Sequence, residues 1–155
     1  MSRDDIAVAE KLRLAEAVVD RGMERWRNVV EMFFTMAERN GDTGLLYHKA
    51  DGRWQETSWR QAAVTVATIA TALKAEGLKP GDRVVLVSEN RPEFPLWDLG
   101  IMADGGITVP TYITNTVRDH QHILENSGAR MAVVSSAKLA RPLLQAAISA
   151  PEMRA

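Results

Sequence analysis

The stretch Val84-Val85-Leu86-Val87 decides the fold, because it is a continuous run of branched apolar residues. Such a run is typical of a strand that is buried on both faces of a parallel sheet. Similar runs follow at Ile107-Thr108-Val109, which we expect Pro110 to stop, and at Met131-Ala132-Val133-Val134. Helical patterns lie between them. This alternation predicts a parallel sheet with right-handed crossover connections.

Two helical patterns flank the first of these strands. Ser58 and Gln61 form a capping box, in which each side chain satisfies a free backbone donor. The helix that they begin ends near Gly77, which fits the left-handed position after a helix. The helix after Pro92 is apolar on nearly every side, so we expect it to be deeply buried.

Two further helices follow later in the chain. Thr116 and Asp119 predict the start of one, and the pattern from Ala137 to Ala150 predicts the other. Pro142 belongs to the first turn of the last helix or shortens that helix, since proline cannot donate a backbone hydrogen bond.

Helices and a β-hairpin precede the alternating part. An amphipathic pattern covers residues 4–25, and a second helical pattern runs from Asn28 to Arg39. Residues 44–57 change to the period of a strand, and Asp51-Gly52 within them is a strong signal for a tight turn. The sequence therefore predicts an α/β fold, with a parallel-rich sheet flanked by helices and preceded by helices and a β-hairpin.

Composition excludes several classes of function. The chain has 155 residues, a formal net charge of −1 and no cysteine. The near-neutral charge gives no reason to expect a nucleic acid or an anionic membrane as partner. The absence of cysteine excludes disulfides and thiolate metal sites. No apolar run approaches the roughly 20 residues of a transmembrane segment, and the first residues do not form a signal peptide. We therefore expect a cytoplasmic protein.

The glycines do not form a nucleotide-binding loop. Gly100, Gly105 and Gly106 lie after a helix and before a strand, which is the wrong order for backbone amides to meet a pyrophosphate. Gly77 and Gly81 are not followed by the Gly-Lys-Ser/Thr of a P-loop.

The histidines do not predict a metal site. His120 and His122 are two residues apart, so on a helix they lie roughly 200° apart around the axis and cannot bind one metal. His48 lies in the hairpin without an obvious partner. We expect all three on the surface, and no metal.

A polar group follows the last predicted strand. Ser135-Ser136 stands at its carboxyl end, where open α/β sheets bind ligands and where serines also cap helices. Lys138 and Arg141 are three residues apart on the next helix, where they could hold a phosphate or lie on a solvated face. The residues alone leave these alternatives open.

Four segments form an ordered series. They are Gly77-Leu78-Lys79-Pro80-Gly81-Asp82-Arg83-Val84, Ser88-Glu89-Asn90-Arg91-Pro92-Glu93-Phe94, residues 103–116 and residues 123–130. Together with the stretch around Trp59, this series resembles the N-terminal region of AMP-forming acyl-CoA synthetases, particularly the long-chain fatty acid–CoA ligases. The resemblance covers residues 28–140.

The resemblance implies a ligase that uses ATP and Mg²⁺ to form an acyl-adenylate from a fatty acid, and then transfers the acyl group to coenzyme A. In this family a Ser/Thr/Gly-rich loop holds the phosphates, and a lysine of a C-terminal domain contacts the adenylate. Residues 1–155 contain neither the loop nor that domain. We therefore expect an N-terminal helix (1–25) and an incomplete AMP-binding portion (26–155). This portion would have no catalytic residue, would be inactive alone and would bind none of these cofactors tightly.

By resemblance, four residues belong to the coenzyme A side of such an enzyme. The turn containing Tyr112 and Thr114, and the basic residues Lys138 and Arg141, hold the positions that lie near coenzyme A in related synthetases. The alternative hypothesis is a non-catalytic binding module. Such a module would self-associate through apolar faces that the rest of the sheet would otherwise cover.

Overall fold

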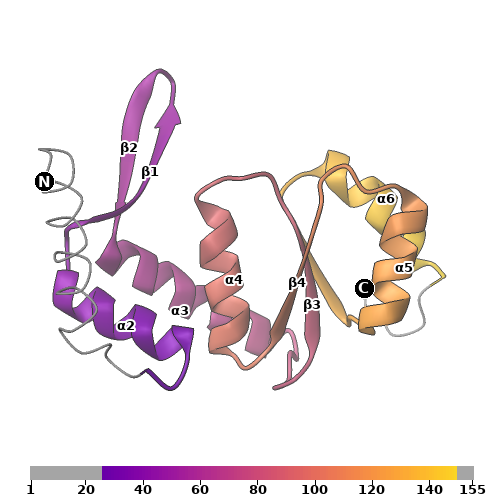
Figure 1. The fold of residues 1–155 in the computed structure, drawn as a ribbon, viewed down its shortest axis with the longest axis horizontal. Helices are drawn as coiled ribbons and strands as arrows, with labels where there is room; N and C mark the ends of the chain where they lie inside the picture. The colour runs from indigo at the N-terminus through magenta and orange to yellow at the C-terminus, as the bar shows by residue number, and fades with distance from the viewer. Residues whose placement is uncertain (1–25, 150–155) are drawn as a thin grey trace, which may run out of the picture.

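The computed structural model describes residues 26–149, and its elements follow the predicted order (Figure 1). The helix predicted over residues 4–25 lies outside the described residues. In chain order the elements are α2 (Val29–Asn40), β1 (Gly44–Ala50), β2 (Arg53–Ser58), α3 (Trp59–Ala75), β3 (Arg83–Val87), α4 (Glu93–Ala103), β4 (Ile107–Thr111), α5 (Val117–Ser127), β5 (Met131–Val134) and α6 (Ala137–Ala147).

Strands β3, β4 and β5 form the predicted parallel sheet, in the order β4-β3-β5. Val85 pairs with Val109 on one side and with Ala132 on the other. Strand β3 is therefore central, although it comes first in the chain. Helices α2, α3 and α4 lie on one side of this sheet, with α4 next to it and α2 farthest from it, and α5 and α6 lie on the other side (Figure 1).

Strand β3 is buried on both of its faces. Val84 belongs to the apolar cluster that includes side chains of α2, α3 and α4, whereas Val85 and Val87 belong to the cluster that includes side chains of α5 and α6. All three valines are fully buried. Successive side chains of a strand point to opposite faces, so one continuous apolar run supplies both cores.

Strands β1 and β2 form the predicted antiparallel hairpin, which is separate from the parallel sheet and extends away from the helices (Figure 1). Asp51 and Gly52 have φ values of 50° and 74°, as a tight two-residue turn requires. Tyr47 and Trp54 are exposed, whereas Leu45 and Leu46 of β1 are partly buried and pack against the core of α2, α3 and α4.

The predicted capping residues set the ends of the helices. The Ser58 hydroxyl accepts a hydrogen bond from the Gln61 N–H at 3.2 Å, and the Gln61 side chain accepts one from the Ser58 N–H at 2.9 Å. Thr116 begins α5 in the same way. At the end of α3, Gly77 has a φ of 88°, and the N–H groups of Gly77 and Leu78 donate back to carbonyls of the last turn.

Helix α4 is less buried than we expected. Only Leu96, Gly100 and Ile101 are buried, and Trp97 is half-buried. One side of α4 packs closely on α3, since a Cβ added at Gly100 would lie 2.4 Å from the Cγ2 atom of Ile69. On another side, Trp97 lines two cavities next to β5, because no described element fills that space.

The two prolines within β4 and α6 also correct our expectations. Pro110 does not stop β4, which continues to Thr111, because in an edge strand the missing N–H can face away from the sheet. Pro142 lies in the second turn of α6 rather than the first, and the helix ends at Ala147 rather than Ala150. Buried side chains on both sides of Pro142 hold the helix across this position.

His120 is buried, although we expected every histidine on the surface. It is 2% exposed, and its Nδ1 has no hydrogen-bond partner within the described part of the chain. His120 and Leu124 are one turn apart and form the buried face of α5. Burial lowers the pKa of His120 because the charged ring loses solvation, and the nearby Asp119 opposes this shift only in part. His48 is half-buried, and His122 is exposed as predicted.

We predict that His120→Leu reduces the loss of stability in acid. A native pKa below the unfolded value of 6.5 means that the unfolded chain binds more protons between these two pKa values. The free energy of unfolding therefore rises with pH in this window and falls as pH drops below about 6.5. Urea unfolding at several pH values measures this slope. The exposed His122→Leu is the control and should keep it, and an unchanged slope in His120→Leu would contradict the prediction.

Arg83 joins the start of β3 to the end of α5. Its guanidinium donates to the carbonyl oxygens of Ser127 at 2.7 Å and Gly128 at 2.8 Å, and to that of Gly81 at 3.2 Å. The carbonyls at the end of a helix lack partners within that helix, and a cation there also complements the helix dipole. Arg83 thus holds α5 against the sheet.

Arg83→Met should lower the free energy of unfolding by about 2–3 kcal/mol, because hydrogen bonds to a charged group are lost and carbonyls lose their donor. Arg60→Met is the matched control. Arg60 pairs with Asp42 through side chains that are 66% and 80% exposed, and such surface pairs contribute at most about 1 kcal/mol. Urea unfolding compares the two variants, and equal losses would refute the role of Arg83.

Candidate functional site

The candidate site lies at the carboxyl ends of the parallel strands. Helix α4 follows β3 on one face of the sheet, while α5 follows β4 and α6 follows β5 on the other face. The loops that leave neighbouring strands therefore diverge. Open α/β sheets bind ligands in the crevice that this divergence creates. Two cavities lie at this edge, and residues of the loop after β3 line both of them.

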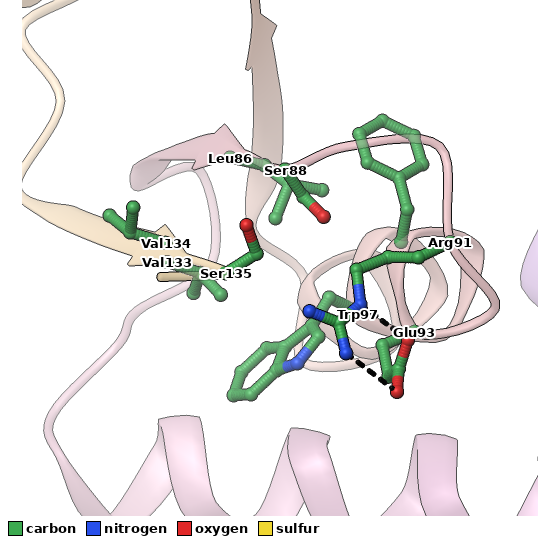
Figure 2. A pocket seen from close by; sticks show the side chains of 9 residues that line it. Leu86, Ser88, Arg91, Glu93, Trp97, Val133, Val134 and Ser135 are labelled. Atoms are coloured by element: carbon green, nitrogen blue, oxygen red, sulfur yellow. Dashed lines mark hydrogen bonds and ion pairs between the residues drawn. The ribbon is translucent and has the colours of Figure 1, made fainter. Parts of the chain in front are cut away.

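The cavity between β3 and β5 has a volume of about 220 Å³ and is lined by both apolar and polar side chains. Figure 2 shows the indole of Trp97 near Val133 and Ser135, and the ion pair of Arg91 and Glu93 beside it. The Arg91 Nε and Nη2 atoms donate to the Glu93 carboxylate at 2.8 and 3.2 Å. This pair lowers the pKa of the Glu93 carboxyl, so both groups stay charged and neutralise each other.

The cavity between β3 and β4 is larger, with a volume of about 390 Å³. Tyr112, which is 80% exposed, lines it together with Thr111, and Glu89 and Asn90 line it from the loop after β3. The Thr111 Oγ1 atom is buried and has no hydrogen-bond partner among residues 26–149.

Glu89 links the two sides of the site. The Ser135 hydroxyl donates to the Glu89 Oε2 atom, so the loop after β3 is tied to the end of β5. This hydrogen bond lowers the pKa of the Glu89 carboxyl below its ordinary value. The positive charges of Arg91 and Lys138 also lower this pKa, but by less.

The four residues predicted from the resemblance are only partly brought together. Tyr112 lines the larger cavity with Glu89, and Lys138 is close enough to Glu89 to affect its titration, so both border the same loop. Lys138 and Arg141 are exposed and three residues apart on α6. Thr114 is exposed in the turn after Tyr112 but does not line the cavity that Tyr112 lines.

The two serines after β5 have different roles: one caps a helix and the other lies at the candidate site. Ser136 accepts a hydrogen bond from the Leu139 N–H at 3.4 Å and caps α6, whereas Ser135 binds Glu89. The glycine clusters lie at the opposite, amino end of the sheet, where the Gly81 N–H donates to the Gly105 carbonyl.

A metal-binding cluster of three or more His, Asp or Glu residues is not found in the described part of the chain. Among the helices of residues 26–149, none is long and apolar enough to cross a membrane.

Glu89 and Trp97 were missed by reasoning from the sequence. Glu89 lies two residues after a buried strand, and position after such a strand is the signal that pointed to Ser135, so Glu89 could have been found. Trp97 could not, because its significance comes from space beside β5 that only the packed structure reveals.

These features define the class: an open α/β domain with a ligand crevice at the carboxyl edge of its sheet. Residues 33–154 match the family described as AMP-binding enzyme. Over 127 residues the chain is 30% identical to Long-chain-fatty-acid–CoA ligase FadD15 of Mycobacterium tuberculosis, a match that covers 82% of this chain and 21% of that ligase.

Solved structures share the fold. A benzoate CoA ligase from Burkholderia xenovorans LB400 superposes with a TM-score of 0.71 at 21% identity, over 83% of this chain and 25% of that one. The N-terminal subdomain of Klebsiella oxytoca NpsA gives a TM-score of 0.66 at 23% identity, over 72% and 28%. The chain belongs to the AMP-binding enzyme family and corresponds to its N-terminal part, and it spans about one fifth of the length of the M. tuberculosis ligase.

Ser135→Ala should raise the pKa of the Glu89 carboxyl, because the hydrogen bond that most favours the charged form is removed. Carbon-13 NMR titration of the Glu89 carboxyl measures the change. Ser88→Ala is the matched control, since the Ser88 hydroxyl donates to the Glu89 backbone carbonyl and leaves the carboxylate alone. Equal titration curves for both variants would contradict the assignment.

Proposed function

We propose that this chain forms the coenzyme A side of an AMP-forming long-chain fatty acid–CoA ligase, and that it is inactive without the rest of that enzyme. The match of residues 33–154 to the AMP-binding enzyme family is the observation that carries the proposal. The similarity to a long-chain-fatty-acid–CoA ligase supports a long-chain fatty acid as the substrate. In this reaction the fatty acid carboxylate attacks ATP, which releases pyrophosphate and forms an acyl-adenylate. The coenzyme A thiol then displaces AMP to give the thioester.

Lys138 and Arg141 suit the phosphates of coenzyme A in charge and placement. Both are exposed on α6, and Lys138 lies in its first turn. The dipole of α6 stabilises an anion at the start of the helix and disfavours a cation there. A bound phosphate would therefore offset the unfavourable interaction of Lys138 with the dipole. Arg141 would add a planar donor that matches phosphate oxygens. Tyr112 and Thr114 would contact the nucleotide from the end of β4.

The residues of this chain do not suit the ATP phosphates or Mg²⁺. The sequence contains no Thr-Ser-Gly-Thr-Thr-Gly-like loop, and residues 26–149 contain no cluster of metal-binding side chains. Both groups would depend on parts of the enzyme that this chain does not match, which is why we expect no adenylation by the chain alone.

A chimera tests the proposal. Residues 33–149 of this chain replace the matched segment of the M. tuberculosis ligase, and fatty-acid-dependent thioester formation is measured. We expect an active chimera, whereas this chain alone should give no fatty-acid-dependent ATP–pyrophosphate exchange above a protein-free control. Exchange by the chain alone would overturn its proposed inactivity.

In the active chimera, Lys138→Ala and Arg141→Ala should each raise the KM for coenzyme A about 10-fold, because a charged contact to phosphate is lost. The kcat should change little, since the phosphates are remote from the reacting thiol. Arg118→Ala, an exposed position on α5, is the control. An unchanged KM for coenzyme A in both test variants would show that Lys138 and Arg141 do not bind coenzyme A.

Self-association is a second candidate function. The apolar residues Ile107, Tyr112 and Ile113 are exposed at the two ends of the edge strand β4. Exposed apolar area of this kind favours association. Size-exclusion chromatography with light scattering should then show a dimer that Ile107→Lys abolishes, and a monomer at every concentration would exclude this candidate.

A further inference from the structure

Three pairs of residues place an Asp or Asn directly before a glycine, namely Asn40-Gly41, Asp51-Gly52 and Asp104-Gly105. In such a pair the backbone nitrogen of the glycine can attack the side-chain carbonyl carbon of the residue before it. Glycine favours this attack, because it has no side chain to hinder the approach and its backbone rotates easily. Each pair is therefore a candidate for spontaneous isomerisation, and the fold decides which of them reacts.

The fold protects Asn40-Gly41 at the end of α2. The Gly41 N–H donates to the Ala37 carbonyl at 2.9 Å, and the Asn40 side-chain amide donates to the Met36 carbonyl at 2.8 Å. The last turn of the helix thus holds both the attacking nitrogen and the side chain that it would attack. Both hydrogen bonds must break before these two groups can meet.

The fold also protects Asp104-Gly105, at the end of α4. The Gly105 N–H donates to the Met102 carbonyl at 3.0 Å, and the Gly105 carbonyl accepts from the Gly81 N–H at 2.8 Å. Gly105 lies against Pro80, since a Cβ added at Gly105 would be 3.2 Å from the Cβ atom of Pro80. The Oδ2 atom of Asp104 is buried. This part of the backbone cannot rotate without breaking these contacts.

Asp51-Gly52 has none of these restraints. Both residues are exposed in the turn between β1 and β2, at the end of the hairpin that points away from the helices (Figure 1). A Cβ added at Gly52 would meet no atom within 4 Å. Within residues 26–149, no backbone carbonyl accepts a hydrogen bond from the Gly52 N–H. The attacking nitrogen and the carboxyl group are therefore both free to move.

We propose that Asp51-Gly52 is a site of spontaneous isomerisation in the folded protein, with water as the only co-reactant. The Gly52 nitrogen forms a bond to the Asp51 Cγ atom, and the OH of the carboxyl group leaves with the amide hydrogen as water. The cyclic imide then takes up water at one of its two carbonyl carbons. Opening at Cγ restores aspartate, whereas opening at the backbone carbonyl gives isoaspartate, an isomer of equal mass whose main chain runs through Cγ.

Isoaspartate would add a methylene group to the backbone of the turn. The two-residue turn aligns Ala50 with Arg53 and Lys49 with Trp54, and the length and type of the turn fix this register. We therefore expect the outer part of the hairpin to lose its pairing. The parallel sheet should persist, because the hairpin pairs with none of its strands. This inference does not depend on the proposed function.

Ageing of the full chain tests the proposal. The protein is kept at neutral pH in buffer and, in parallel, in guanidinium chloride that unfolds it. Peptide mapping with an isoaspartyl methyltransferase as the probe then measures isoaspartate at each of the three pairs. Folding should slow the reaction about 10-fold at Asn40-Gly41 and Asp104-Gly105, since a hydrogen bond of the glycine amide must first break. At Asp51-Gly52 folding should change the rate little.

Two results of the ageing experiment would overturn the proposal. One is an equal effect of folding at all three pairs, whether the reaction is slowed or unchanged. The other is a folded protein without isoaspartate at Asp51.

Variants locate the reaction. Asp51→Glu should abolish methylation of the hairpin peptide, because the longer side chain would have to close a larger ring, which forms more slowly. Asp51→Asn should restore it with loss of ammonia, since asparagine also tolerates the left-handed backbone of this turn. Asp104→Glu is the matched control and should leave the hairpin peptide unchanged. Methylation of the folded Asp51→Glu variant at the wild-type level would overturn the proposal.

Hydrogen exchange of the aged chain tests the structural consequence. Chains that contain isoaspartate should exchange faster in the hairpin peptide and at the original rate in a peptide that covers β3. Unchanged exchange in the hairpin of these chains would refute the predicted loss of pairing.

Discussion

The burial of β3 on both faces is the constraint on which the rest of this structure depends. Val84 and Val85 are neighbours in sequence but belong to different cores. Because both faces are apolar, hydrophobicity alone would tolerate a shift of the strand by one residue. Arg83 helps to fix the register of β3, because its hydrogen bonds to the end of α5 hold the start of the strand at one position.

The same arrangement gives the carboxyl edge of the sheet its chemistry. The loop after the central strand must lie between the loops of both neighbours, so Glu89 reaches Ser135 on one side and shares a cavity with Tyr112 on the other. Charges at this edge are mostly balanced locally, as in the pair of Arg91 and Glu93. Lys138 and Arg141 are both exposed on α6, and the charge of Lys138 acts on Glu89 at this edge.

Local signals predicted most of the fold, and long-range packing explains most of the differences. The capping box of Ser58 depends on residues close in sequence, so it could be predicted. The continuation of β4 through Pro110 depends on its place at the edge of the sheet, which no local pattern encodes. The burial of His120 depends on which face of α5 meets the core. For the candidate site, Tyr112 and Lys138 were placed by resemblance, whereas the bond between Glu89 and Ser135 joins loops far apart in sequence and required the fold.

The central position of β3 also has a consequence for synthesis. This strand leaves the ribosome before β4 and β5, and therefore before either of the strands that pair with it. The residues of α6 that complete the second core, Leu139 and Leu143 among them, are made later still. Of the three parallel strands within residues 26–149, the one buried on both faces is thus made before either of its partners. Exposed apolar segments of this kind can aggregate or engage chaperones during translation.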